Sequence, residues 1–149
     1  GLFLEGDFAK VRDVVNVMLA VKDFEDFESA LEASFAALEI DKAAIVLYDK
    51  QIENSRASKF DIPEKAKLVY AFSSATGFKT TENVEFNPRE KFLPFSNFDN
   101  DVTVFMLKPL FLRENQIGYI YFTTGSFTGS IYDMLCMQIS NALVSLKLN

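Results

Sequence analysis

Apolar residues recur at three- and four-residue intervals at both ends of the chain, which is the spacing of one helix face. This spacing predicts a helix over residues 7–21 and another over 130–148. A third helix is predicted over 23–38, where acidic residues crowd the first turns and meet the positive end of the helix dipole. The sequence therefore begins with two helices and ends with one.

Short apolar runs between these helices predict β-strands. The clearest runs are 43–48 and 68–73. Farther along, 102–112 and 117–123 flank a short polar turn, which predicts a β-hairpin. Pro109 cannot donate to a sheet ladder, so we expect it at an edge or a bulge. The connection 76–100 is irregular but apolar, and we expect it to fold back on the protein; its aromatic residues are Phe78, Phe86, Phe92, Phe95 and Phe98.

Charge and composition exclude several classes of function. The net charge is −6 and the basic residues are scattered, so we expect no nucleic-acid partner. No stretch reaches the roughly 20 apolar residues that cross a bilayer.

The first residues, 1–7, lack the pattern of a signal peptide, and we expect a cytoplasmic protein. Because residue 1 is not Met, we expect one domain, 1–149, from a larger multidomain protein.

The chain has no histidine and one cysteine, Cys136. This removes the commonest general base, metal ligand and haem ligand, and it rules out a Ser-His or Cys-His nucleophilic site within the chain. No Gly-rich phosphate loop is present either. We therefore expect no catalytic residues, no metal and no haem, and no intramolecular disulfide. We do not expect an enzyme.

The order of these elements, and three stretches of sequence, resemble the GAF family. The stretches are ALEIDKAAIVLYD (37–49), VTVFMLKPLFLRENQIGYIYF (102–122) and IYDMLCMQISNALVSLKL (131–148). The resemblance implies an α+β fold, with a central antiparallel sheet that has the N- and C-terminal helices on one face and the long aromatic connection on the other. The Asn-Lys-Phe-Asp-Glu signature of cyclic-nucleotide members is missing, and bilin-binding members need a differently placed cysteine.

The resemblance also implies a function. GAF domains are sensory units of bacterial signalling proteins, so we expect a regulatory domain that senses a small molecule and relays the signal through its terminal helices to an output such as a diguanylate cyclase. A ligand-free dimerisation and relay module is the alternative. A ligand pocket would lie between the connection and the sheet, although a collapsed aromatic core is equally compatible with the pattern. Its candidate residues are the walls Phe72, Phe86, Phe92 and Phe95 and the anion contact Arg89.

The terminal helices carry more apolar surface than one sheet face needs. Only Asp133 and Lys147 are charged in 130–148, which indicates a helix that is covered on two sides. Surplus apolar surface favours association, so we expect a homodimer in which these helices join a bundle. Alternatively, residues 7–38 of the same chain cover that helix. The candidate interface residues are Val11, Val14, Met18, Leu135, Ile139, Ala142, Leu143 and Leu146.

Overall fold

A computed structural model describes residues 5–53, 61–96, 98 and 104–148. The chain divides into two compact units. One contains residues 1–40 and 124–149, and the other contains residues 41–123. The first is helical and the second is built on a β-sheet.

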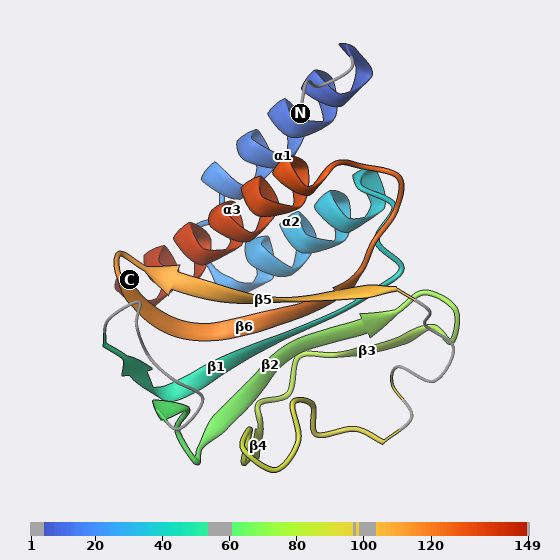
Figure 1. Ribbon diagram of the computed structural model, residues 1–149. Coiled ribbons are helices and arrows are strands. Elements are labelled where there is room, and N and C mark those ends of the chain that lie inside the picture. The colour runs from blue at the N-terminus through green and yellow to red at the C-terminus, as the bar shows by residue number, and fades with distance from the viewer. Residues whose placement is uncertain (1–4, 54–60, 97, 99–103, 149) are drawn as a thin grey trace. The chain divides into compact units, whose positions relative to one another are not determined.

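The described part of the helical unit contains α1 (Glu5–Leu19), α2 (Phe24–Ala37) and α3 (Gly129–Leu148). Helix α1 packs against both α2 and α3 (Figure 1). The three predicted helices are therefore present, each within two residues of its expected bounds. Within the described residues, none of these helices has the length and apolar character needed to cross a membrane.

Local sequence determines both ends of α2. Asp23 is the N-cap, and its carboxylate accepts a hydrogen bond from the Asp26 backbone N–H at 2.7 Å. At the other end, Glu39 takes a left-handed backbone conformation with φ of 59°. This turn lets the Ile40 N–H donate to the Phe35 carbonyl at 2.9 Å, so one of the last helical carbonyls finds a partner.

The sheet unit contains six described strands, all paired antiparallel: β1 (Lys42–Ile52), β2 (Ala66–Ser73), β3 (Phe78–Thr80), β4 (Val84–Phe86), β5 (Phe105–Leu112) and β6 (Asn115–Thr123). Their order is β3-β2-β1-β6-β5, and β4 also pairs with β2 (Figure 1). The predicted α+β class with an antiparallel sheet is confirmed.

The predicted hairpin is confirmed as β5 and β6, joined by a turn in which Arg113 has a positive φ. Pro109 lies in β5 at the end of the strand order, as expected of a residue that cannot donate to a neighbour. The short strands β3 and β4 were not predicted. Each has three residues, too few for an alternating pattern, and both depend on pairing with β2.

Candidate functional site

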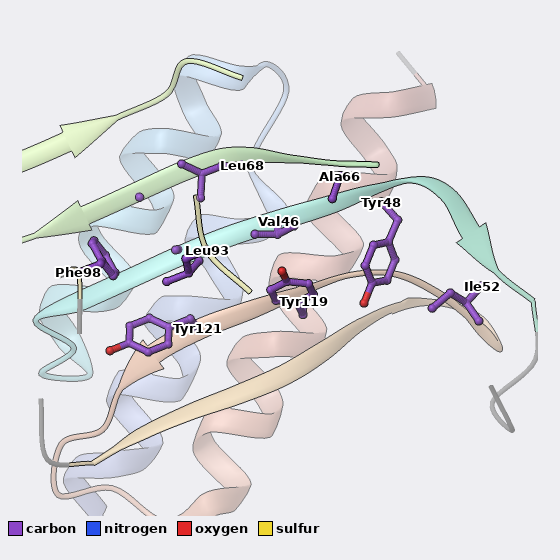
Figure 2. Close-up of a cluster of buried hydrophobic side chains, with 11 residues drawn as sticks. Val46, Tyr48, Ile52, Ala66, Leu68, Leu93, Phe98, Tyr119 and Tyr121 are labelled. Carbon is purple, nitrogen blue, oxygen red and sulfur yellow. The ribbon is translucent and has the colours of Figure 1, made fainter. Parts of the chain in front are cut away.

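One face of the sheet carries a buried cluster that is rich in aromatic rings (Figure 2). Strands β1, β2 and β6 supply most of it, and the connection after β4 adds Leu93 and Phe98. The connection therefore folds back on the sheet, as predicted. The cluster consists of Ala44, Val46, Tyr48, Ile52, Ala66, Leu68, Ala71, Leu93, Phe98, Tyr119 and Tyr121.

An irregularity in β2 decides which side chains reach this face. The pairing of β1 with β2 shifts register between Ile45 and Val46, which leaves Val69 as an extra residue. One extra residue exchanges the two faces for all side chains beyond it. Ser73 therefore lies on the face of the aromatic cluster, and Phe72 lies on the opposite face. The prediction of Phe72 as a pocket wall is corrected accordingly.

A cavity of about 520 Å³ opens at the end of this face where β1 begins and β2 ends. Its floor is a row of three side chains from neighbouring strands, because Ser73 pairs with Lys42 on one side and with Phe78 on the other. Directly paired residues of antiparallel strands point to the same face and lie about 5 Å apart. The described residues that line it are Lys42, Ser73, Thr76, Phe78, Phe95, Ser96 and Phe98.

Lys42 supplies the positive charge of this cavity. Its Nζ donates to the backbone carbonyl of Phe98 at 2.5 Å and lies 5.4 Å from the centre of the Phe98 ring. The ammonium is partly buried, and no carboxylate among the described residues forms an ion pair with it. A lysine has three N–H donors, and among the described residues two of them have no hydrogen-bond partner.

Ser73 lies beside Lys42 and is 4% exposed. Its hydroxyl has no hydrogen-bond partner in the part of the chain that the structure describes. A buried hydroxyl without a partner costs about 1–3 kcal/mol. A buried hydroxyl without a partner in a native protein calls for an explanation, such as an ordered water or an ion that completes its hydrogen bonding.

The aromatic wall of the cavity is a chain of ring contacts. The Phe78 and Phe95 rings meet edge to face with their centres 5.4 Å apart, and the Phe95 and Phe98 centres are 5.6 Å apart. Phe98 continues to Tyr121 of β6 at 5.6 Å. This wall offers an apolar surface next to the polar pair Lys42 and Ser73.

A second cavity of about 260 Å³ lies on the same face, beside Tyr48 and Tyr119. The two rings are 5.8 Å apart, and the Tyr119 hydroxyl donates to the backbone carbonyl of Phe92 at 2.5 Å. Burial raises the pKa of Tyr48 to about 12. Burial raises the pKa of Tyr119 further, with a smaller contribution from Tyr48. Both phenols are neutral at physiological pH, and the Tyr119 hydroxyl acts as a hydrogen-bond donor.

The structure separates the other predicted pocket residues. Phe95 lines the larger cavity and Phe92 the smaller one, whereas Phe86 packs against the aromatic cluster. Arg89 is held elsewhere: its Nε donates to the Ile62 carbonyl at 2.5 Å, and its guanidinium pairs with Glu64 at 3.2 Å. Arg89 thus ties the connection to the segment before β2 and lines neither cavity.

Lys42 and Ser73 were missed by the sequence reasoning. Lys42 comes directly before the apolar run 43–48, and a charged residue at that position indicates only that the strand begins there. Ser73 would belong to the opposite face if β2 alternated without interruption. The signal that could have identified Lys42 is its position two residues before Ala44, on the same side of β1.

The predicted dimer residues are mostly core residues. Six of the eight are buried in the folded chain: Val14, Met18, Leu135, Ile139, Ala142 and Leu143. As placed, they offer no surface to a second copy, so this part of the prediction is corrected. Val11 and Leu146 are partly exposed. The exposed apolar side chains of these helices are instead Phe8, Leu19 and Met137. Dimerisation itself stays a prediction.

Acidic side chains crowd the start of α2, but they form no metal site. Among the described residues, no group of three or more His, Cys, Asp or Glu side chains is arranged to hold a metal ion. The two carboxylates at this point, Asp23 and Asp26, accept backbone N–H bonds at the helix start. They therefore cap the helix start, where the sequence predicts acidic residues that match the helix dipole.

Two solved structures with a similar fold are GAF domains. The GAF domain of an Acinetobacter phosphoenolpyruvate-protein phosphotransferase superposes with a TM-score of 0.64 at 13% identity, over 98% of this chain and 97% of that one. The NLH2 GAF domain of A. aeolicus gives a TM-score of 0.53 at 14% identity, over 96% of each chain. The sequence matches no protein-family model and no curated protein. The likeness to these two structures shows that the chain has the fold of a GAF domain.

Proposed function

We propose that this chain is a non-catalytic regulatory domain that binds a small molecule in the cavity at Lys42 and Ser73. Binding changes the balance between two arrangements of the protein, and the terminal helices pass this change to an output domain. The domain works in the cytoplasm, where its single cysteine has no need of a disulfide partner.

The observation that carries the proposal is the cavity itself. Its volume of about 520 Å³ lies within the range of roughly 300–1,000 Å³ that is usual for small-molecule sites. Apolar rings form its wall, and a few polar groups converge on its floor, which is the usual composition of such sites. One similar solved structure is described as a GAF domain in an inactive state, which fits a fold that can take two states. The absence of histidine supports a non-catalytic role.

Thermal unfolding in the presence of a panel of metabolites and nucleotides tests the proposal. A ligand present at about 100 times its dissociation constant stabilises the folded protein by about 2.7 kcal/mol. For a domain of this size, that raises the melting temperature by roughly 5–10 °C. A hit is then titrated against Ser73→Leu, which fills the cavity floor, and against Ser74→Leu, which adds the same volume at an exposed neighbouring position.

We expect the stabilisation to disappear in Ser73→Leu and to persist in Ser74→Leu, with both variants showing the circular dichroism of the parent. A panel in which no compound raises the melting temperature would count against small-molecule sensing. Equal stabilisation of both variants would place the binding site elsewhere.

A second candidate function is dimerisation without a ligand. It is favoured by Phe8 and Leu19 of α1, which are 59% and 73% exposed. The two residues are 11 positions apart, close to three helical turns, so they lie on one stripe. Val15, which is partly exposed, lies between them on the same stripe. An exposed apolar stripe of this kind fits the same stripe on a second copy.

Light scattering distinguishes this second candidate. A ligand-free module gives twice the mass of one chain at tens of micromolar, and Leu19→Glu restores the mass of the monomer. Ala33→Glu, at an exposed position of α2, is the matched control and leaves the dimer intact. A monomer at every concentration would remove this candidate without affecting the first.

A further inference from the structure

We infer that the ligand of the larger cavity is a small organic carboxylate with an apolar or aromatic body. The carboxylate binds Lys42 and Ser73, and the body lies against Phe78, Phe95 and Phe98. This inference rests on the proposed function, because it names the chemistry of the molecule that the same cavity binds.

The polar floor favours an anion over a neutral group. Lys42 carries a partly buried charge whose described partners are one carbonyl oxygen and one ring face. Burying a charge is costly unless an opposite charge accompanies it. The hydroxyl of Ser73 is a second donor, without a described partner, on the neighbouring strand. A carboxylate has two acceptor oxygens, so one group can accept from both Lys42 and Ser73.

The charge of the site favours a monoanion. Lys42 is the one charged side chain among the described lining residues. The whole chain carries a net charge of −6, so a second negative charge in the cavity would face an unfavourable field. A carboxylate therefore fits better than a phosphate monoester, which is close to dianionic at neutral pH.

The apolar wall determines the rest of the molecule. Phe78, Phe95 and Phe98 form a continuous set of ring contacts on one side of the cavity. Ring edges and faces of this kind accept another aromatic ring or a short aliphatic group. The cavity is open at its rim, where Thr76 and Ser96 are exposed. Polar substituents at the far end of the ligand therefore stay in contact with water.

Nuclear magnetic resonance titration with matched probes tests the inference. The probes are phenylacetate, its neutral analogue phenylacetamide and the dianion phenyl phosphate. We expect phenylacetate to shift the resonances of the cavity residues and to bind about tenfold or more tightly than phenylacetamide, since charge-assisted hydrogen bonds are the stronger ones. Phenyl phosphate is expected to bind more weakly than phenylacetate.

The variants locate the anion contact. Lys42→Met should lower the affinity for phenylacetate by about tenfold or more, so that phenylacetate no longer binds more tightly than phenylacetamide. Lys42→Arg, which keeps the positive charge, should retain part of this preference for phenylacetate. Ser73→Ala, which nearly keeps the volume of the site, should lower the affinity for phenylacetate by about three- to tenfold. Lys91→Met removes the same charge at an exposed position outside the cavity and should change nothing. Dispersed spectra of each variant establish that it is folded.

Three results would overturn the inference: equal or tighter binding of phenylacetamide, tighter binding of phenyl phosphate, or unchanged affinity for phenylacetate in both Lys42→Met and Ser73→Ala. If a neutral compound shifts the cavity resonances as strongly as phenylacetate, the protein still binds small molecules, and only the assignment of the ligand as a carboxylate is wrong. If no probe shifts them, the carboxylate is wrong, and the thermal panel decides the proposed function separately.

Discussion

The Tyr119 hydroxyl of β6 donates a hydrogen bond to the backbone carbonyl of Phe92 at 2.5 Å. This bond joins the central part of the sheet to the connection that walls both cavities. It links residues 27 positions apart in the sequence. The connection is therefore anchored by a polar contact in addition to its aromatic packing.

Removing this bond should loosen the connection. We expect Tyr119→Phe to lower the free energy of unfolding by about 1–2 kcal/mol, because the variant keeps the ring and leaves the Phe92 carbonyl without its donor. Urea unfolding measures the change. Tyr48→Phe is the matched control, since its ring lies 5.8 Å from Tyr119 and no described hydrogen bond uses its hydroxyl. A loss of the same size in both variants would contradict the anchoring role.

Alkaline pH should destabilise the protein through the same tyrosines. Burial raises the pKa of Tyr48 from 10.0 to about 12, and it raises that of Tyr119 as well. The native state therefore keeps these protons at a pH where the unfolded chain has lost them. The stabilising contribution is complete below pH 10 and is lost as the pH rises from 10 towards 12.

Ultraviolet titration of tyrosinate formation checks this expectation. In the folded protein, Tyr48 and Tyr119 should ionise at a higher pH than a free tyrosine. The fall in unfolding free energy above pH 10 should be shallower in the Tyr48→Phe, Tyr119→Phe double variant. A fall of the same steepness in the double variant would assign the alkaline effect to other groups.

Gly118 is required by the close approach of two strands. A Cβ at this position would overlap the Val46 carbonyl oxygen and lie 2.9 Å from the Leu47 Cα. Both obstacles are backbone atoms of β1, so no side-chain rotation relieves the clash. We expect Gly118→Ala to destabilise the protein by about 2–3 kcal/mol in urea unfolding. Gly129→Ala, where a Cβ meets nothing within 4 Å, should change stability by less than about 0.5 kcal/mol.

Glu39 is strained at the end of α2. Its φ of 59° is unfavourable for a residue with a Cβ by about 1–2 kcal/mol. Its side chain accepts a hydrogen bond from the Ser126 hydroxyl at 3.0 Å, so the control must remove that bond as well. We expect Glu39→Gly to be more stable than Glu39→Ala by about 1 kcal/mol in thermal unfolding. Equal stability of the two variants would show that the strain is relaxed.

The features of the fold that could be predicted depend on interactions between residues that are close in the sequence. The start of α2 depends on Asp23 and Asp26, three residues apart, and the β5–β6 hairpin depends on a two-residue turn between alternating strands. The edge position of Pro109 follows from its missing N–H. Such features need no knowledge of the rest of the chain. The prediction of an aromatic connection on the sheet succeeded for a similar reason, since its apolar residues must avoid water.

The sequence by itself determined the three helices, the four longer strands, their order and the α+β class, because periodicity, caps and turns act over a few residues. Only the tertiary structure decided the site. The extra residue Val69 brings Ser73, rather than Phe72, to the aromatic face, and strand register places Ser73 beside Lys42. Packing among the helices likewise left Leu19 exposed. Register and packing depend on contacts between distant segments, and the local pattern of apolar residues does not encode which of two faces each contact will cover.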